Sequence, residues 1–181
     1  MTPYHALVAD ELAAIPGQDA LERQHLQQAR DWVASGVELC RLHKPATPSQ
    51  HLVSYFVLDD GQHLLLVDHH NAGLWLPTGG HVDPGEHPRV TVQRELLEEL
   101  GLALTGPVGP PLMLTLGTTV GLTAGHTDVS LWYRVPARRD QPLHWDRSEF
   151  ADVRWFAFDA LPLARCEPQL ARYVARLRAE A

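Results

Sequence analysis

The hydrophobic period of the sequence changes near residue 51, and this change constrains the fold more than any other feature. Before it, apolar residues recur at helical spacing over residues 7–15 and again over 21–33, where Asp19 precedes the second segment as a capping residue. After it, dense apolar runs such as residues 52–58 are typical of strands. We therefore predict an N-terminal helical extension over residues 1–44 and a main domain over residues 45–181.

The order of elements in the main domain indicates a mixed sheet. Strands are predicted at 52–58, 63–67, 112–116, 129–135 and 153–158, helices at 88–100 and 167–178, and a Gly/Pro-rich loop at 73–85. The first two strands are separated by a short turn, so we expect them to form a hairpin. Strands and helices do not alternate strictly, which favours a mixed sheet with helices on its faces.

Composition narrows the class of protein. The chain of 181 residues carries a formal net charge of −7, which argues against a surface that neutralises the phosphates of duplex nucleic acid. No segment reaches the ~18 apolar residues of a membrane helix, and no Arg or Lys precedes Arg23 as a signal peptide would require. Two cysteines, Cys40 and Cys166, cannot form a disulfide framework. These features predict a cytoplasmic protein without membrane contact.

Three glutamates in the predicted helix 88–100 indicate where the chemistry lies. Glu95, Glu98 and Glu99 are related by offsets of three and four, which place their carboxylates on one helix face with Cβ atoms roughly 5–6 Å apart. Like charges this close repel one another, and the macrodipole near the helix C-terminus disfavours anions as well. The arrangement is costly unless a cation lies between the carboxylates.

Oxygen ligands of this kind suit hard divalent cations, so the three glutamates predict a site for Mg²⁺ or Mn²⁺. Gly79 and Gly80 let the backbone approach a ligand closely, and a carbonyl there would add another oxygen. Taken alone, the glutamates also fit a solvated acidic helix face. The apolar residues of the same helix are expected to anchor it to the core: Val90, Val92, Leu96, Leu97 and Leu100.

The stretch from Gly80 to Leu102 resembles the box of the Nudix hydrolases. That box reads Gly, five residues, Glu, seven residues, Arg-Glu, an aliphatic residue, any residue, Glu-Glu, any residue, Gly and an aliphatic residue. Every specified position is matched by the following residues: Gly80, Glu86, Arg94, Glu95, Leu96, Glu98, Glu99, Gly101 and Leu102.

The resemblance implies a three-layer α/β/α sandwich with a mixed sheet, and hydrolysis of a nucleoside diphosphate linked to another moiety. By the same resemblance Glu95, Glu98 and Glu99 bind Mg²⁺ or Mn²⁺ with help from the Gly79 or Gly80 carbonyl. Glu86 and Arg94 would hold the box together, as their positions on either side of the helix start also allow. The substrate is then a small nucleotide.

In many members of the family, a glutamate outside the box and polar residues near the phosphates also contribute to the site. This chain offers candidates for both. Glu149 matches the position of an added metal ligand or general base, with Asp146 and Asp152 as weaker rivals. Together with Glu98 and Glu99 it completes the predicted catalytic set. His70 and His81 are the candidates for substrate contact, and His126 is a weaker one.

Two alternatives remain open on the sequence: a catalytically silent Nudix-fold module and an enzyme resembling isopentenyl-diphosphate isomerase. Silent modules usually lose acids of the box, and none is lost here. Isomerase chemistry needs a cysteine near the cleft, where neither Cys40 nor Cys166 is obviously placed. The N-terminal helices would shape the cleft or the interface of a homodimer.

Overall fold

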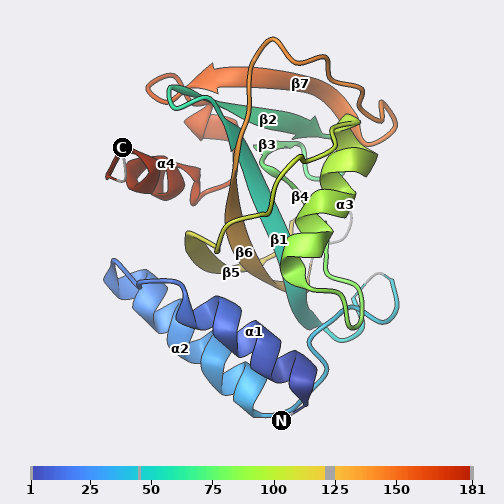
Figure 1. Ribbon diagram of the computed structural model, residues 1–181, viewed down its shortest axis with the longest axis vertical. Coiled ribbons are helices and arrows are strands. Elements are labelled where there is room, and N and C mark those ends of the chain that lie inside the picture. The colour runs from blue at the N-terminus through green and yellow to red at the C-terminus, as the bar shows by residue number, and fades with distance from the viewer. Residues whose placement is uncertain (1, 45, 121–124, 180–181) are drawn as a thin grey trace.

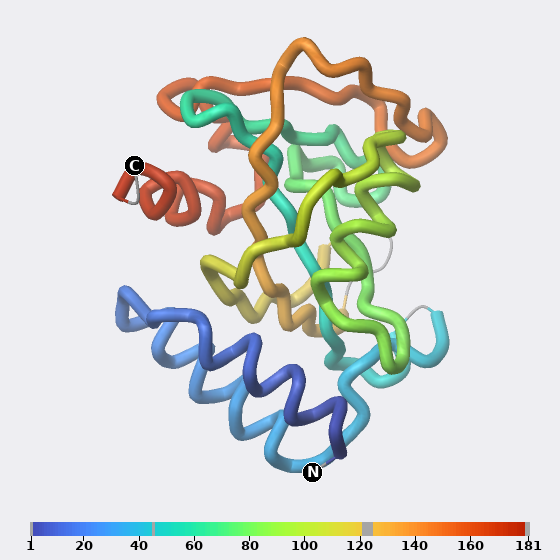
Figure 2. The backbone as a smooth tube through the Cα atoms, viewed as in Figure 1, coloured from blue at the N-terminus to red at the C-terminus, as the bar shows by residue number. Residues whose placement is uncertain are grey.

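Both N-terminal helices begin at a side chain that caps them in the computed structural model, which describes residues 2–44, 46–120 and 125–179. The Thr2 hydroxyl accepts a hydrogen bond from the His5 N–H at the start of α1 (Pro3–Ala13). The Asp19 carboxylate accepts one from the Glu22 N–H at the start of α2 (Ala20–Ala34), as the sequence predicts. The two helices pack side by side at one end of the molecule (Figure 1, Figure 2).

A mixed sheet forms the centre of the described structure. Its strands are β1 (Gln50–Asp59), β2 (His63–His69), β3 (Leu74–Leu76), β4 (Thr78–His81), β5 (Met113–Thr118), β6 (Thr127–Pro136) and β7 (Phe150–Ala157). They follow the order β3-β2-β1-β6-β5, with β4 also paired to β1 and β7 to β2. β1 and β6 are parallel, and the other pairings are antiparallel.

The predicted hairpin of the first two strands is present only at its turn. Asp59 of β1 lies opposite Leu64 of β2, and away from the turn β1 runs beside β4 and β6 while β2 runs beside β7. The prediction of a loop over residues 73–85 is wrong for its first part, which contains β3 and β4. Gly79 and Gly80 pair with β1 through their backbones, and a glycine pair carries no side-chain pattern that would signal a strand.

Helices cover both faces of the sheet and produce three layers. On one face, Val92 and Leu96 of α3 (Pro88–Leu100) belong to the same buried cluster as Phe56 of β1. On the other, Tyr173 of α4 (Leu170–Ala179) packs in a second cluster with Val57, because successive residues of a strand point to opposite faces. The mixed sheet, its flanking helices and the N-terminal helical region thus agree with the predicted fold class.

Two residues expected in the anchoring face of α3 lie outside it. Val90 and Leu97 are 47% and 55% exposed, whereas Val92, Leu96 and Leu100 are buried. The buried stripe is narrower than the apolar content of the helix suggests, because Glu99 occupies part of the inward face.

α2 covers the outer edge of the sheet at β5. The Glu22 carboxylate accepts a hydrogen bond from the Leu114 N–H at 3.3 Å, and the His25 ring accepts one from the Leu116 N–H at 3.3 Å. Glu22 also pairs with Arg176 of α4, and both side chains are almost fully buried. α2 and the last helix, α4, are therefore joined to each other at the same edge strand. In the described ranges, no helix combines the length and the hydrophobicity needed to cross a membrane.

Candidate active site

Specific backbone and side-chain contacts hold α3 in place at both of its ends. Its N-cap, His87, accepts a hydrogen bond from the Arg89 N–H, and the Ser54 hydroxyl of β1 donates to the Pro88 carbonyl at 2.8 Å. At the other end Gly101 takes the left-handed conformation, with φ of 67°, that closes the last turn. The helix is thereby held in register with β1.

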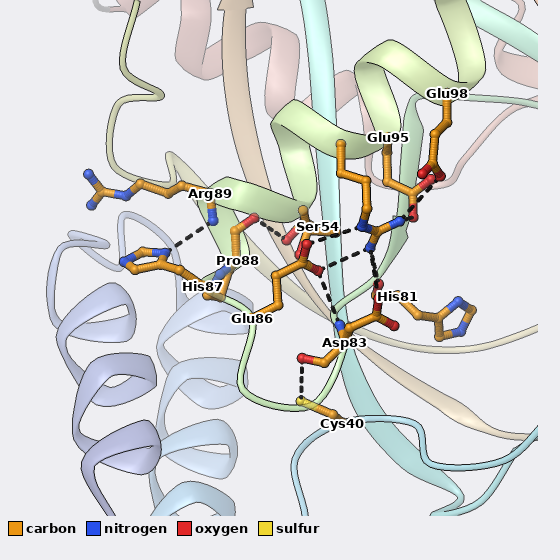
Figure 3. Close-up of polar contacts among 12 residues, drawn as sticks. Cys40, Ser54, His81, Asp83, Glu86, His87, Pro88, Arg89, Glu95 and Glu98 are labelled. Carbon is orange, nitrogen blue, oxygen red and sulfur yellow. Dashed lines mark hydrogen bonds and ion pairs between the residues drawn. The ribbon is translucent and has the colours of Figure 1, made fainter.

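The Arg94 guanidinium connects the loop before α3 to the glutamates on it. It donates to both carboxylate oxygens of Glu86, at 3.1 and 3.0 Å, and to the His81 carbonyl at 3.1 Å (Figure 3). It also donates to Glu95 at 2.7 Å and to Glu98 at 3.4 Å. The sequence predicts the contact of Glu86 with Arg94, and the structure adds that the same guanidinium reaches two of the three glutamates.

The three glutamates of α3 differ in their exposure to water. The side chain of Glu98 is 60% exposed and that of Glu95 is 15% exposed, while Glu99 is buried at 6%. Glu99 accepts a hydrogen bond from the Gly79 N–H at 3.2 Å. The acidic ridge is thus not a solvated helix face, because two of its three carboxylates are largely withdrawn from water.

Withdrawal from water perturbs these acids. Burial raises the pKa of Glu99 well above the ordinary value of a glutamate, and the charges of Glu95 and Glu149 raise it further. Burial also raises the pKa of Glu95, against the opposing effect of the Arg94 hydrogen bond. A divalent cation between them would favour the ionised forms, so the donor set fits the metal that the sequence predicts.

Gly80 lies against the Glu95 carboxylate with no room for a side chain. A Cβ atom at position 80 would stand 1.9 Å from Oε1 of Glu95, and one at Gly79 would stand 2.5 Å from the Ser54 carbonyl oxygen. Both glycines therefore permit a close approach that any larger residue prevents.

Gly80→Ala is expected to displace Glu95 and to weaken Mn²⁺ binding by about 10–100-fold, the range for changes that misplace a metal ligand. Isothermal titration of the purified variant with Mn²⁺ measures this effect. Gly106→Ala is the matched control, since a Cβ there meets nothing within 4 Å. Equal Mn²⁺ affinity in both variants would contradict the placement of Glu95 at the metal.

A cavity of about 660 Å³ opens beside the buried glutamates. Gly79, Gly80 and Glu99 line it, and its walls come from β1, β4, β5, β6 and the segments around them. A cavity of this volume is large enough to hold a nucleotide. Its apolar lining is formed by Val53, Tyr55, Leu74, Leu76 and Leu116.

The structure brings Glu149 into this cavity and leaves its rivals outside the wall. Its carboxylate lies 3.7 Å from Nε2 of His69, and its charge acts on both Glu95 and Glu99. Asp146 accepts hydrogen bonds from Ser148, and Asp152 pairs with Arg154, both at exposed positions. Glu149 is therefore the acid outside the box that shares the electrostatic environment of the glutamates.

The two histidines predicted to contact substrate are placed differently. His81 lines the cavity, and its imidazole extends away from Glu86 in Figure 3. His70 is exposed, lies outside the cavity lining, and its Nε2 is 3.2 Å from the Arg147 carbonyl oxygen. His69 takes the cavity-facing position instead, because neighbouring residues at a strand end point to opposite sides.

Sequence reasoning missed residues in the cavity wall and directly beside it. Arg41 and Lys44 enter the wall from the segment that follows the N-terminal helices. His51 and Asp128 lie opposite each other on the parallel strands β1 and β6, beside His81 and His126. His51 and Asp128 each lie near the start of a strand. Their proximity can be predicted only if it is known that these two strands pair in parallel.

Neither cysteine is available to a ligand in the cavity. Cys40 is fully buried, 3.1 Å from the Tyr4 hydroxyl, and Cys166 is buried near α4. Burial raises the pKa of both thiols, which disfavours the reactive thiolate. The site therefore contains the acids for metal-assisted hydrolysis and no cysteine placed for isomerase chemistry in its lining.

Comparison with known proteins agrees with this chemistry. The profile of the NUDIX domain matches residues 49–177. A segment of 55 residues is 44% identical to the putative 8-oxo-dGTP diphosphatase of Bacillus subtilis (strain 168), covering 29% of this chain and 37% of that protein. The match thus spans little more than a third of the length of that relative.

Solved structures share the fold at low sequence identity. The MutT NUDIX hydrolase from Burkholderia pseudomallei superposes with a TM-score of 0.60 at 23% identity, covering 70% of this chain and 97% of that one. The NUDIX domain of Shewanella oneidensis NrtR, complexed with ADP ribose, gives a TM-score of 0.56 at 22% identity, covering 77% and 94%. At these identities the likeness establishes the fold.

Proposed function

The chain belongs to the Nudix family, and from this premise we propose that it is a divalent-metal-dependent hydrolase of a phosphoric anhydride bond in a nucleotide. The observation that carries the proposal is the pair of Glu95 and Glu99, withdrawn from water with raised pKa values beside a nucleotide-sized cavity. Carboxylates in such surroundings are costly to the fold unless they serve a cation.

Glu95, Glu98 and Glu99 would hold Mg²⁺ or Mn²⁺, together with the Gly80 carbonyl and Glu149. When bound, such an ion neutralises charge on the diphosphate oxygens and lowers the pKa of a coordinated water. The residues of the chain do the rest. The Arg94 guanidinium donates hydrogen bonds that orient the Glu95 and Glu98 carboxylates. Its hydrogen bonds to Glu86 fix the loop that leads to α3.

Glu149 is the proposed general base or an additional ligand. Its side chain is 45% exposed, so it can reach a water at the cavity mouth and pass a proton to solvent. Arg41 and Lys44 provide positive charge in the same wall for the substrate phosphates. Val53, Tyr55 and Leu116 offer apolar surface for the rest of the nucleotide.

Within this reaction class we propose a purine deoxynucleoside triphosphate, including its 8-oxo form, as the substrate. Support comes from the name of the Bacillus subtilis relative and from the apolar residues that line the same cavity as Arg41 and Lys44. A silent Nudix module is disfavoured by the complete set of box acids, and an isomerase by the buried cysteines.

Incubation of the full chain with 8-oxo-dGTP, dGTP, ATP, ADP-ribose, nucleotide sugars and dinucleotides tests the proposal, with chromatographic separation of the nucleotide products as the readout. Turnover of at least one compound in Mg²⁺ or Mn²⁺, abolished by EDTA and restored by the metal, is expected. Products formed in ¹⁸O-water then identify the phosphorus attacked. No cleavage of any compound at saturating metal would reject the reaction class, and cleavage only of others would reject the substrate.

A further inference from the structure

A second group of potential ligands lies at the cavity wall, apart from the α3 glutamates: His81, His126 and Asp128 line the cavity, and the fully buried His51 adjoins them. His51, His81, His126 and Asp128 each offer one atom, and these four atoms lie within 4.8 Å of one another. The group joins three strands: His51 stands on β1, His81 ends β4, and Asp128 lies on β6, two residues after His126. Nitrogen-rich sets of this kind differ in chemistry from the all-oxygen box.

The polar atoms of this group lack the partners that buried groups normally have. Nε2 of His51, Nε2 of His81 and Oδ1 of Asp128 are shielded from water, and none has a hydrogen-bond partner in the described part of the chain. His51 is fully buried and His126 is 3% exposed. Buried polar atoms without partners are costly, so their convergence needs a reason.

In two of the histidines, the ring nitrogen outside the group already has a hydrogen-bond partner in the protein. Nδ1 of His51 lies 2.8 Å from the Pro48 carbonyl oxygen, and since a carbonyl only accepts, Nδ1 carries the hydrogen. Nε2 of the neutral ring then presents its lone pair to the group. Nδ1 of His126 lies 3.0 Å from the Thr119 hydroxyl. A hydrogen bond from the second ring nitrogen to a backbone carbonyl or other polar group is how proteins orient histidine ligands of metals.

The distances within the group approach those of a four-coordinate ion. Zinc bonds of about 2.0–2.1 Å place tetrahedral ligand atoms about 3.3 Å apart. Oδ1 of Asp128 lies 3.4 Å from Nε2 of His51 and 3.3 Å from Nε2 of His126. The widest separation in the group, 4.8 Å, has to shorten by about 1.5 Å when such an ion binds.

The charges of the group favour a cation over an anion. Asp128 supplies a carboxylate among three imidazoles. The charges of Arg41 and Lys44 act on His81, and that of Arg41 on Asp128 as well, but within the described ranges no Arg or Lys nitrogen lies within ion-pair distance of Asp128. A phosphate placed among these residues would meet that carboxylate directly. Arg41 and Lys44 line the same cavity, so they are available to the substrate phosphates instead.

We propose that His51, His81, His126 and Asp128 bind one zinc-class divalent ion at a site separate from the α3 glutamates. Three imidazoles and one carboxylate are ligands that Zn²⁺ takes readily and that Mg²⁺ does not. The ion joins the ends of β1, β4 and β6 and fixes the strand that carries Gly79 and Gly80. The proposal does not depend on the reaction proposed above.

Metal analysis of the full-length protein tests this site. After EDTA treatment and desalting, equilibrium dialysis against Zn²⁺ is expected to give one tightly held ion per chain, and Co²⁺ in its place is expected to give the visible absorption of a tetrahedral complex. His51→Gln and Asp128→Asn are expected to weaken Zn²⁺ binding at least tenfold and to remove the Co²⁺ absorption. Asp128→Asn keeps the size of the side chain, so it serves where His51→Gln fails to fold.

Two controls separate the site from its surroundings. His144→Gln removes an exposed histidine elsewhere and is expected to leave Zn²⁺ binding unchanged. Glu99→Gln alters the box and is expected to keep the tightly held Zn²⁺. Absence of a tightly held ion in the wild type, or equal Zn²⁺ affinity in Asp128→Asn and the wild type, overturns the proposal. Inorganic phosphate binding that depends on His51 while Zn²⁺ binding does not would also overturn it, in favour of an anion site.

Discussion

Glu99→Gln is expected to lower metal-dependent turnover by about a thousandfold or more. The reason is that a metal contributes several kcal/mol to stabilising charge in the transition state, and each 1.36 kcal/mol is a factor of ten. Glutamine keeps the size of the side chain and can still accept from the Gly79 N–H. Steady-state rates over a range of Mg²⁺ concentrations measure the loss, and Glu98→Gln is expected to act in the same direction.

The same variant is expected to fold at least as well as the wild type in the absence of metal. Because burial raises the pKa of Glu99, the folded metal-free protein binds a proton more readily than the unfolded chain does. The contribution of Glu99 to stability is then greatest below the unfolded pKa of this residue and is lost as the pH rises toward its folded pKa. Glu99→Gln removes this dependence.

Thermal unfolding in EDTA at several pH values shows whether the loss of activity is separate from stability. A melting temperature at neutral pH equal to or above that of the wild type is expected. Wild-type turnover in both glutamine variants would remove Glu98 and Glu99 from the metal site. A large fall in the melting temperature of Glu99→Gln would instead assign this residue a structural role.

Glu22→Ala is expected to destabilise the protein by about 3–5 kcal/mol, the range for breaking a buried ion pair by removing one partner. The change leaves the buried Arg176 with only the more distant Asp19 carboxylate, at 3.8 Å, and removes the acceptor of the Leu114 and Gln18 N–H groups. Urea unfolding followed by circular dichroism measures the change in the free energy of unfolding.

Asp31→Ala is the matched control for this variant. Asp31 lies on the same helix, is exposed, and accepts a hydrogen bond from the Gln27 side chain. Its loss is expected to change the free energy of unfolding by no more than about 0.5 kcal/mol. Similar values for the two variants would show that α2 is not held to the sheet through Glu22.

The sequence predicts the fold class because its strongest signals are local. The Asp19 cap and the Gly101 terminus, for example, depend on neighbouring residues, and both are present in the structure. The hairpin prediction overstates the pairing of β1 with β2, since strand partners are chosen by distant contacts. Leu97 shows the same limit for helices, because a hydrophobic residue in an amphipathic segment can still face water.

The box could be located from the spacing of its residues and Glu149 from the family pattern, whereas the exposure of each acid and most of the cavity wall could not be predicted. The offsets between Glu95, Glu98 and Glu99 determine one helix face, but only the fold shows that Glu99 is buried and Glu98 exposed. His69 and His70 are adjacent, so their order along the chain does not say which one faces the cavity. The meeting of His51 with Asp128 depends on the parallel pairing of β1 with β6, a long-range contact that neither segment encodes by itself.

α2, which lies along β5, restricts the ways in which two copies of this molecule can associate. The Leu114 and Leu116 N–H groups are already bonded to side chains of α2, so they cannot receive a strand from a second molecule. A continuous sheet running through two subunits at this border is thereby ruled out. Self-association has to use helical or loop surfaces, or another margin of the sheet.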